Sequence, residues 1–189
     1  MQKSVLFAFA ALSLTACKTL PQTTTPSATA QSVAVVSQEA VPIVTSSANV
    51  LGTDGSEIGT VNLTDGPHGL LVRVELGTAS LTQGWHGLHL HQVGDCSDTG
   101  VYKLSGGHVG KVADGHGLLN PAGPEGGDTP NIYAHADGAA ALEFITNRTN
   151  LSELRDADGS ALIIHAGPDD HITQPIGGAG ARVACAVIR

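Results

Sequence analysis

The 189-residue sequence predicts an all-β domain: an antiparallel Greek-key sandwich or barrel with two long functional loops. Three observations support this fold class. Glycine contributes 24 residues and aromatic side chains only 3% of the chain, so we expect an aliphatic core and many turns. Short apolar stretches recur between turn sequences that contain Gly and Asp. No stretch of the sequence combines a helical period with capping residues.

The predicted strands follow one another at short intervals. The clearest runs from Leu70 to Leu76, where Leu and Val alternate with Arg73 and Glu75, so one face points inward and the other into water. The stretch from Trp85 to His91 alternates in the same way. The remaining expected strands have similar lengths and are bounded by turn residues: 48–51, 58–63, 139–146, 161–165 and 182–188.

Two stretches without strand signals interrupt this pattern. Residues 94–130 and 166–180 are rich in Gly, Pro, Asp and His. Long loops in a compact domain usually carry function. We therefore expect the functional residues in these loops and at the strand ends beside them.

The first 16 residues are typical of an export signal. Lys3 precedes an apolar run that ends at Leu14 and is shorter than the roughly 20 residues that span a bilayer. The following Leu-Thr-Ala-Cys resembles a bacterial lipobox, which predicts cleavage before Cys17 and attachment of lipid to its thiol. Ala28-Thr29-Ala30 is an alternative secretory cleavage site, but it lies well past the apolar run.

Residues 17–40 are expected to form a flexible tether, because a composition dominated by Thr, Ser, Pro, Gln and Ala cannot build a core. Residues 41–189 would then form a single domain. Removal of residues 1–16 takes away one Lys, so the formal charge of −8 becomes −9. Such an acidic chain is not expected to bind nucleic acid.

Two cysteines remain beyond the tether, Cys96 and Cys185. In an exported protein they can form a disulfide. The closed loop would run through most of the domain and contribute roughly 4 kcal/mol. The alternative is two separate buried thiols.

Nine histidines in a chain with one Met and one Trp suggest metal binding or proton transfer. His89 and His91 lie two residues apart on an expected strand, which points both imidazoles to one side. Such pairs are also common on exposed strands. Further residues of ligand type lie in or beside the two loops: His108, His116, Asp128 and His165. Imidazole and carboxylate favour Cu(II) and Zn(II), and the scarcity of Cys and Met argues against Cu(I) storage or an iron–sulfur cluster.

Several segments surround these residues in a fixed order. They are Gly-Trp-His-Gly-Leu-His-Leu-His at 84–91, Gly-Asp-Cys at 94–96, Ser-Gly-Gly-His at 105–108, Gly-His-Gly at 115–117 and Gly-Asp-Thr-Pro-Asn at 127–131. Two more follow: Gly-Ser-Ala-Leu-Ile-Ile-His-Ala-Gly-Pro-Asp-Asp at 159–170 and Gly-Ala-Arg-Val-Ala-Cys at 180–185. With this ordered set, residues 48–189 resemble the bacterial Cu/Zn superoxide dismutase family, in the lipoprotein form that Cys17 indicates.

The resemblance implies a copper site and a zinc site that share one histidine. The implied copper ligands are His89, His91, His108 and His165. The implied zinc ligands include His108, His116 and Asp128. His108 would bridge the two ions as an imidazolate.

Other residues match supporting positions of the family. Asp169 matches a carboxylate that joins a copper-ligand His to a zinc-ligand His and so fixes both rings. Arg182 matches the active-site arginine, which guides and holds superoxide beside the copper. Cys96 and Cys185 match the intradomain disulfide. We expect His86 to make hydrogen bonds near the site. The remaining histidines are expected to be turn or surface residues: His68, His135 and His171.

One position departs from the family pattern. The zinc ligand expected three residues before Asp128 is His in the family and Glu125 here. Glu binds zinc through oxygen, so we predict Glu125 as the fourth zinc ligand. A second carboxylate would make loss of the His108 proton harder. The alternative is that Glu125 faces solvent and zinc is weak or absent.

The resemblance implies dismutation: one superoxide reduces Cu(II) and leaves as dioxygen, and a second reoxidises Cu(I) and takes up protons to give hydrogen peroxide. Because the chain is acidic, attraction of this anion must be local, and Lys103 and Lys111 join Arg182 as candidates.

The alternative function is a non-catalytic copper-binding module on the same fold. A zinc hydrolase is disfavoured, since no open zinc site with a general base is evident. The expected location is the periplasm, with a lipid anchor on Cys17. Lys18 after the lipobox favours the outer membrane by family resemblance. A homodimer is compatible with the sequence.

Overall fold

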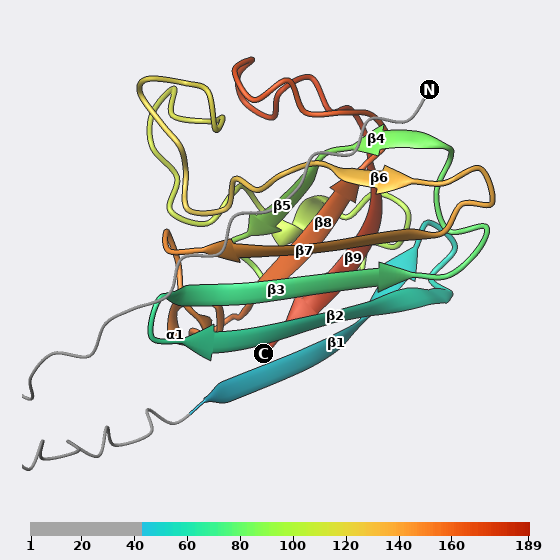
Figure 1. The fold of residues 1–189 in the computed structure, drawn as a ribbon, viewed down its shortest axis with the longest axis horizontal. Helices are drawn as coiled ribbons and strands as arrows, with labels where there is room; N and C mark the ends of the chain where they lie inside the picture. Colours follow the sequence, from blue (N-terminus) through green and yellow to red (C-terminus); the bar gives the residue numbers. More distant parts are fainter. Residues whose placement is uncertain (1–42) are drawn as a thin grey trace, which may run out of the picture. The chain divides into compact units, whose positions relative to one another are not determined.

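The computed structural model of this protein describes residues 43–189, so the expected signal peptide and the whole of the expected tether, Cys17 included, lie outside the described residues. The described residues form a nine-stranded antiparallel sheet that curls into a nearly closed barrel (Figure 1). This architecture confirms the predicted all-β fold class.

The strands appear at nearly every position that the sequence predicts. They are β1 (Val44–Gly52), β2 (Glu57–Gly66), β3 (Gly69–Leu76), β4 (Gly84–His86), β5 (Leu88–His91), β6 (Ile132–Ala134), β7 (Ala140–Thr146), β8 (Ser160–His165) and β9 (Arg182–Ile188). Their order across the sheet is β4-β6-β7-β3-β2-β1-β9-β8-β5. Because β6 and β7 lie between β3 and β4, the chain must cross over them, as Greek-key connections do.

The stretch from Trp85 to His91 is two strands, whereas the sequence predicts one. β4 pairs with β6 and β5 with β8, so the chain changes neighbours at Gly87. The N–H of Gly87 donates to Gly167 at 2.8 Å and its carbonyl accepts from His165 at 2.8 Å. A Cβ on Gly87 would lie 2.8 Å from that of Ala179, so only glycine lets the second loop pack here. The break therefore has a steric reason.

The predictions also missed three short elements. β6 has three residues, the 3-10 helix η1 (Lys103–Ser105) three and the helix α1 (Leu151–Leu154) four. Segments of this length carry no readable period. Within residues 43–189, no helix is long and apolar enough to cross a membrane.

The barrel interior is aliphatic, as the composition predicts. Leu70, Val72 and Val74 of β3 are fully buried. On the opposite face of β3, Arg73 pairs with Glu143 of β7 at 2.5 Å. Both side chains of this pair are about half exposed, so water screens the interaction and it adds little to stability. The alternation in β3 thus places one face in the core and one in water.

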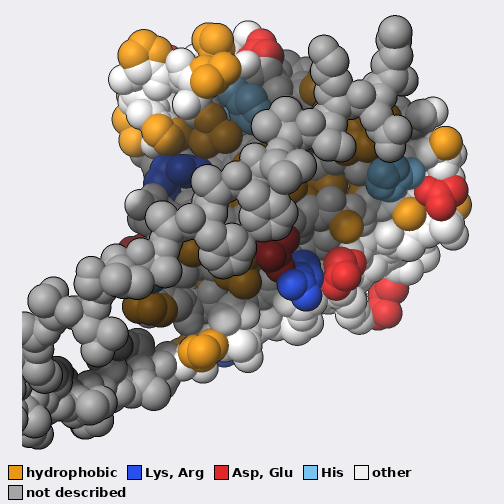
Figure 2. Space-filling view, in the orientation of Figure 1, with side chains coloured by type: hydrophobic (Ala, Val, Ile, Leu, Met, Phe, Trp, Pro, Cys, Tyr) orange, Lys and Arg blue, Asp and Glu red, His pale blue; other side chains and the backbone are white. Residues whose placement is uncertain are grey.

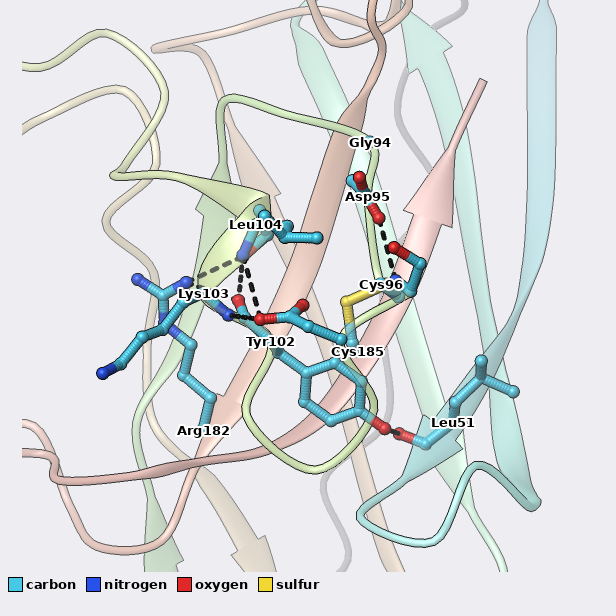
Figure 3. The surroundings of a disulfide bond; sticks show 12 residues. Leu51, Gly94, Asp95, Cys96, Tyr102, Lys103, Leu104, Arg182 and Cys185 are labelled. Carbon is cyan, nitrogen blue, oxygen red and sulfur yellow. Dashed lines mark hydrogen bonds between the residues drawn. A yellow bond between two sulfur atoms is a disulfide. The ribbon is translucent and has the colours of Figure 1, made fainter.

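A disulfide between Cys96 and Cys185 joins the start of the first long loop to β9 (Figure 3). It rules out separate thiols and confirms the predicted pair. The bond closes a sequence separation of 89 residues, which in the chain-entropy model stabilises the fold by about 4.6 kcal/mol. Tyr102 packs beside it, fully buried, and donates its hydroxyl hydrogen to the carbonyl of Gly52. This loop is therefore fixed to the barrel before it reaches the predicted ligands.

Candidate metal centre

The first long loop, between β5 and β6, covers the edge of β5 that no other strand of residues 43–189 occupies. The N–H and carbonyl of Leu90 each make a 2.9 Å hydrogen bond to the backbone of this loop. Isolated bridges place His91 opposite His108 and His89 opposite Asp128. The loop therefore brings its own ligand-type residues against the two histidines of the strand.

The four predicted copper ligands share one property: each has a buried ring nitrogen without a hydrogen-bond partner. These atoms are Nδ1 of His89 and Nε2 of His91, His108 and His165. The ring centroid of His89 lies 4.2 Å from that of His108 and 4.9 Å from that of His165. Figure 2 shows histidine surface at two separate places on one face, whereas the four predicted copper ligands are each at most 3% exposed. Buried polar atoms are normally paired, so converging unpaired nitrogens fit a cation that binds imidazole.

The other ring nitrogens of three of these histidines fix the orientation of the rings. Nδ1 of His91 lies 2.9 Å from the carbonyl of Gly106, and Nδ1 of His165 lies 3.0 Å from that of Gly180. A carbonyl only accepts, so these Nδ1 atoms carry the proton and leave the Nε2 lone pairs free. Nε2 of His89 lies 2.8 Å from Oδ2 of Asp169, which leaves its Nδ1 free.

Burial keeps this side of the centre neutral. It lowers the pKa of His89 to about 3, against the opposing hydrogen bond to Asp169. It lowers the pKa of His165 to about 4, and that of His91 well below its ordinary value. Neutral imidazole is the form that binds a metal ion.

The predicted zinc side consists of imidazole and carboxylate. Nδ1 of His116 lies 2.8 Å from Oδ1 of Asp128, and Nδ1 of His108 lies 3.1 Å from the same oxygen. Nε2 of His116 lies 3.2 Å from Oδ1 of Asp169. Asp169 thus links His116 to His89, as the resemblance implies for it.

This side holds charge. Burial opposes protonation of His116, but its hydrogen bonds to Asp128 and Asp169 outweigh that effect and raise its pKa to about 9. Burial alone would raise the pKa of the carboxyls of Asp128 and Asp169. Hydrogen bonds from histidine outweigh this effect and hold both pKa values well below their usual range. The metal-free zinc side is therefore a buried imidazolium between carboxylates.

Glu125 belongs to this buried cluster. It is 3% exposed, its Oε2 lies 2.9 Å from Nδ1 of His108, and its Oε1 accepts from the N–H of Val112 at 3.2 Å. The alternative of a solvent-facing Glu125 is therefore wrong. Glu125 nevertheless lies outside the group whose candidate ligand atoms all lie within 4.8 Å of one another: His89, His108, His116 and Asp128.

Arg182 begins β9 and lies beside an opening of about 300 Å³ that reaches His165 and is also lined by Lys103. Its guanidinium donates to the carbonyl of Tyr102 at 2.5 Å, to Oγ of Ser105 at 2.9 Å and to the carbonyl of Gly106 at 2.7 Å. Figure 3 shows Arg182 beside Tyr102 and Lys103. Lys111 does not line this opening. The cations beside the copper side are thus Arg182 and Lys103.

The other histidines divide into three groups. His86 lies 2.7 Å from the carbonyl of His165 through Nδ1, close to the site as expected. His68 and His135 are exposed, also as expected. His171 lies in a bend, as expected for a turn residue, but it is only partly exposed and its Nδ1 lies 3.5 Å from Oδ2 of Asp169, a contact that the sequence did not indicate.

Sequence reasoning gave no role to two amides at the centre, those of Asn131 and Gln174. Asn131 bonds the backbone of Asp169, and Gln174 bonds the backbone of His116. Asn131 is the last residue of the family-like segment Gly-Asp-Thr-Pro-Asn at 127–131, and its place there could have indicated a role. Gln174 had none, since its contact crosses 58 residues.

A nearly closed antiparallel barrel with a pocket of four imidazoles, one of which adjoins a carboxylate cluster, defines a protein that could hold two transition-metal ions. The chain belongs to the copper/zinc superoxide dismutase family, whose model matches residues 57–188. This confirms the resemblance on which the expected residue roles rest.

Individual relatives of known sequence or structure also match the chain. The chain is 47% identical over 143 residues to the Cu-Zn superoxide dismutase of Caulobacter vibrioides, covering 72% of this chain and 80% of that one. The solved Cu/Zn superoxide dismutase of Brucella abortus aligns with a TM-score of 0.64 at 29% identity, over 77% of this chain and 100% of that one. A mutant of a SOD-like protein from Bacillus subtilis aligns with a TM-score of 0.68 at 31% identity, over 75% and 96%.

Proposed function

We propose that the protein is a superoxide dismutase that binds copper and zinc. The observation that carries this proposal is the set of four buried, unpartnered imidazole nitrogens. The proposed copper ligands are His89, His91, His108 and His165. The proposed zinc ligands are His108, His116, Asp128 and Glu125. Copper, when bound, supplies the one-electron redox chemistry that the protein cannot.

The residues around the copper side would bind the substrate and manage its protons. Superoxide is an anion and the chain carries a net charge of −8, so attraction depends on Arg182 and Lys103 at the opening. Arg182 would orient the anion next to His165. Nε2 of His108, the nitrogen proposed to bind copper, would carry a proton for peroxide formation only while it does not hold copper.

The lipid anchor, the periplasmic location and the outer membrane remain part of this proposal, supported by the lipobox-like sequence before Cys17 and by Lys18. Labelling of whole cells with radioactive palmitate tests the anchor. We expect incorporation that Cys17→Ser abolishes, and an unlabelled parent would refute it. A homodimer is proposed on the resemblance alone.

One observation favours the second candidate, a non-catalytic copper-binding module. The Arg182 guanidinium already donates to three acceptors of the loop, so it could serve to hold the loop and not an anion. A fold alone does not fix an activity, and one structural relative is named only SOD-like.

Metal analysis and dismutation kinetics on the purified protein decide between these functions. Dismutation that requires copper supports the enzyme; copper binding without turnover supports the module. Arg182→Ala should lower the second-order rate at low salt by about tenfold and flatten its dependence on ionic strength. Lys103→Ala should act in the same direction while leaving the three loop bonds intact, and exposed Arg155→Ala is the control. Rates of both Arg182→Ala and Lys103→Ala that match this control would contradict the steering role.

A further inference from the structure

The two long loops hold each other through a reciprocal pair of side-chain amides. Gln174 of the second loop bonds both backbone groups of His116 in the first: its Oε1 accepts from the N–H at 3.1 Å and its Nε2 donates to the carbonyl at 2.8 Å. Asn131, where the first loop ends, bonds both backbone groups of Asp169 in the second: its Oδ1 accepts at 2.9 Å and its Nδ2 donates at 2.8 Å. Each amide therefore fixes the backbone of one residue in the other loop.

The two fixed residues meet at the metal centre. Nε2 of His116 lies 3.2 Å from Oδ1 of Asp169, and Oδ2 of Asp169 lies 2.8 Å from Nε2 of His89. Asp169 thereby joins the two sides of the centre. The amides of Gln174 and Asn131 hold the two residues whose side chains make the zinc-side half of this connection.

The backbones of the two loops also pack against each other at this point. A Cβ on Gly117, next to His116, would lie 2.0 Å from the carbonyl oxygen of His171. That same oxygen accepts from the N–H of Leu119 at 3.1 Å. With no room for the loops to approach further, the amides determine how the loops align along this contact.

We infer that Gln174 and Asn131 are positioning residues for the metal centre. Gln174 sets the place of His116, and Asn131 sets the place of Asp169. The inference rests on the metal sites of the proposed function. His116 belongs to the zinc set alone, whereas Asp169 contacts both sides, so loss of the Gln174 amide weakens zinc binding and loss of the Asn131 amide weakens the binding of both metals.

Gln174 is well suited to a test because it is an exposed residue. Substitutions at exposed positions usually change the stability of the fold little. Thr173→Ala is a matched control in the same loop, since the Thr173 hydroxyl bonds only Asp170 of its own loop. A loss of metal affinity in Gln174→Ala that the control lacks would therefore not be a general effect of loosening the loop.

The first measurement is hydrogen exchange of single amides in the metal-free protein, by NMR. Gln174→Ala should speed exchange at His116 by about tenfold or more and leave Asp169 unchanged. Asn131→Ala should do the reverse. Asn131→Asp is the second variant, in case Asn131→Ala does not fold. It keeps the acceptor for the Asp169 N–H and loses the donor to the Asp169 carbonyl. Exchange at Asp169 should then stay near the parental rate, while the affinities for both metals fall.

The second measurement is metal affinity by competition with a chromophoric chelator. Gln174→Ala should lower zinc affinity by about tenfold, the low end for partners outside the ligand set, with copper affinity unchanged. Asn131→Ala should lower both by a similar factor. Parental exchange at His116 in Gln174→Ala, or a zinc affinity equal to that of Thr173→Ala, would overturn the inference. A parent protein that binds neither metal would instead refute the proposed function, and the exchange rates would still decide whether the amides fix the two residues.

Discussion

The copper side and the zinc side of the centre lie in one buried pocket and share His108, yet they are in opposite electrostatic states. On the copper side, His89, His91 and His165 keep free lone pairs and lowered pKa values. On the zinc side, His116 has a pKa of about 9 and is paired to carboxylates.

The difference shows how one pocket can prepare for two ions. On the copper side, no proton has to leave the nitrogens that would bind the ion. The other nitrogen of each ring makes the hydrogen bond, to a backbone carbonyl or to Asp169. The zinc side must first lose the proton of His116, so zinc binding has to release a proton at neutral pH. We therefore expect zinc affinity to depend on pH near neutrality more steeply than copper affinity.

The largest expected effect breaks the copper side alone. His91→Ala removes a ring that makes no contact with the carboxylates of the zinc side. Copper affinity should fall by more than about 100-fold, because even partners outside a ligand set contribute about 10- to 100-fold. Zinc affinity should stay within about twofold. Chelator competition measures both, with exposed His68→Ala as the control; equal losses of the two metals would show that the sides are not independent.

The next effect is the pH dependence of the free energy of unfolding, to which His165 of the copper side and His116 of the zinc side contribute with opposite signs. His165 has a folded pKa of about 4 against 6.5, so the unfolded state binds more protons between these values. Its contribution is complete above pH 6.5 and is lost as the pH falls towards 4, by roughly 3 kcal/mol at about 1.4 kcal/mol per unit. His116 has a raised pKa, so its contribution is complete below pH 6.5 and is lost as the pH rises through 9.

Urea unfolding of the metal-free protein from pH 4 to 10 checks this prediction. We expect a loss of stability on both limbs. His165→Gln should flatten the acid limb and leave the alkaline limb as it is. An acid limb that is unchanged in His165→Gln would contradict the assignment.

The smallest expected effect concerns Glu125. Glu125→Gln keeps the size of the side chain and removes its charge beside His108. If Glu125 binds zinc, zinc affinity should fall by about tenfold and copper affinity by less than about twofold. The surface variant Glu143→Gln is the control for loss of one negative charge. An unchanged zinc affinity would leave zinc with three protein ligands.

The sequence predicted the parts of the molecule that obey a short period or belong to a contiguous segment. The alternation in β3 and the His89–His91 pair are of this kind. The division of the predicted strand at Gly87 was missed because alternation continues through it, and only the pairing partners change. The roles of His171 and Gln174 depend on contacts between distant loops, which leave no pattern in the sequence.

The first long loop has a second consequence through the strand edge that it covers. Unpaired edges of β-strands can associate with those of another copy. Here the edge of β5 is satisfied by a loop, and that loop is held by the disulfide to β9 and by the contacts of His108 and Asp128. Reduction would remove the first of these restraints, and the contacts of His108 and Asp128 would then hold the loop without the help of a bound metal ion. The reduced, metal-free protein is therefore the form in which the edge of β5 is most open to association with another copy.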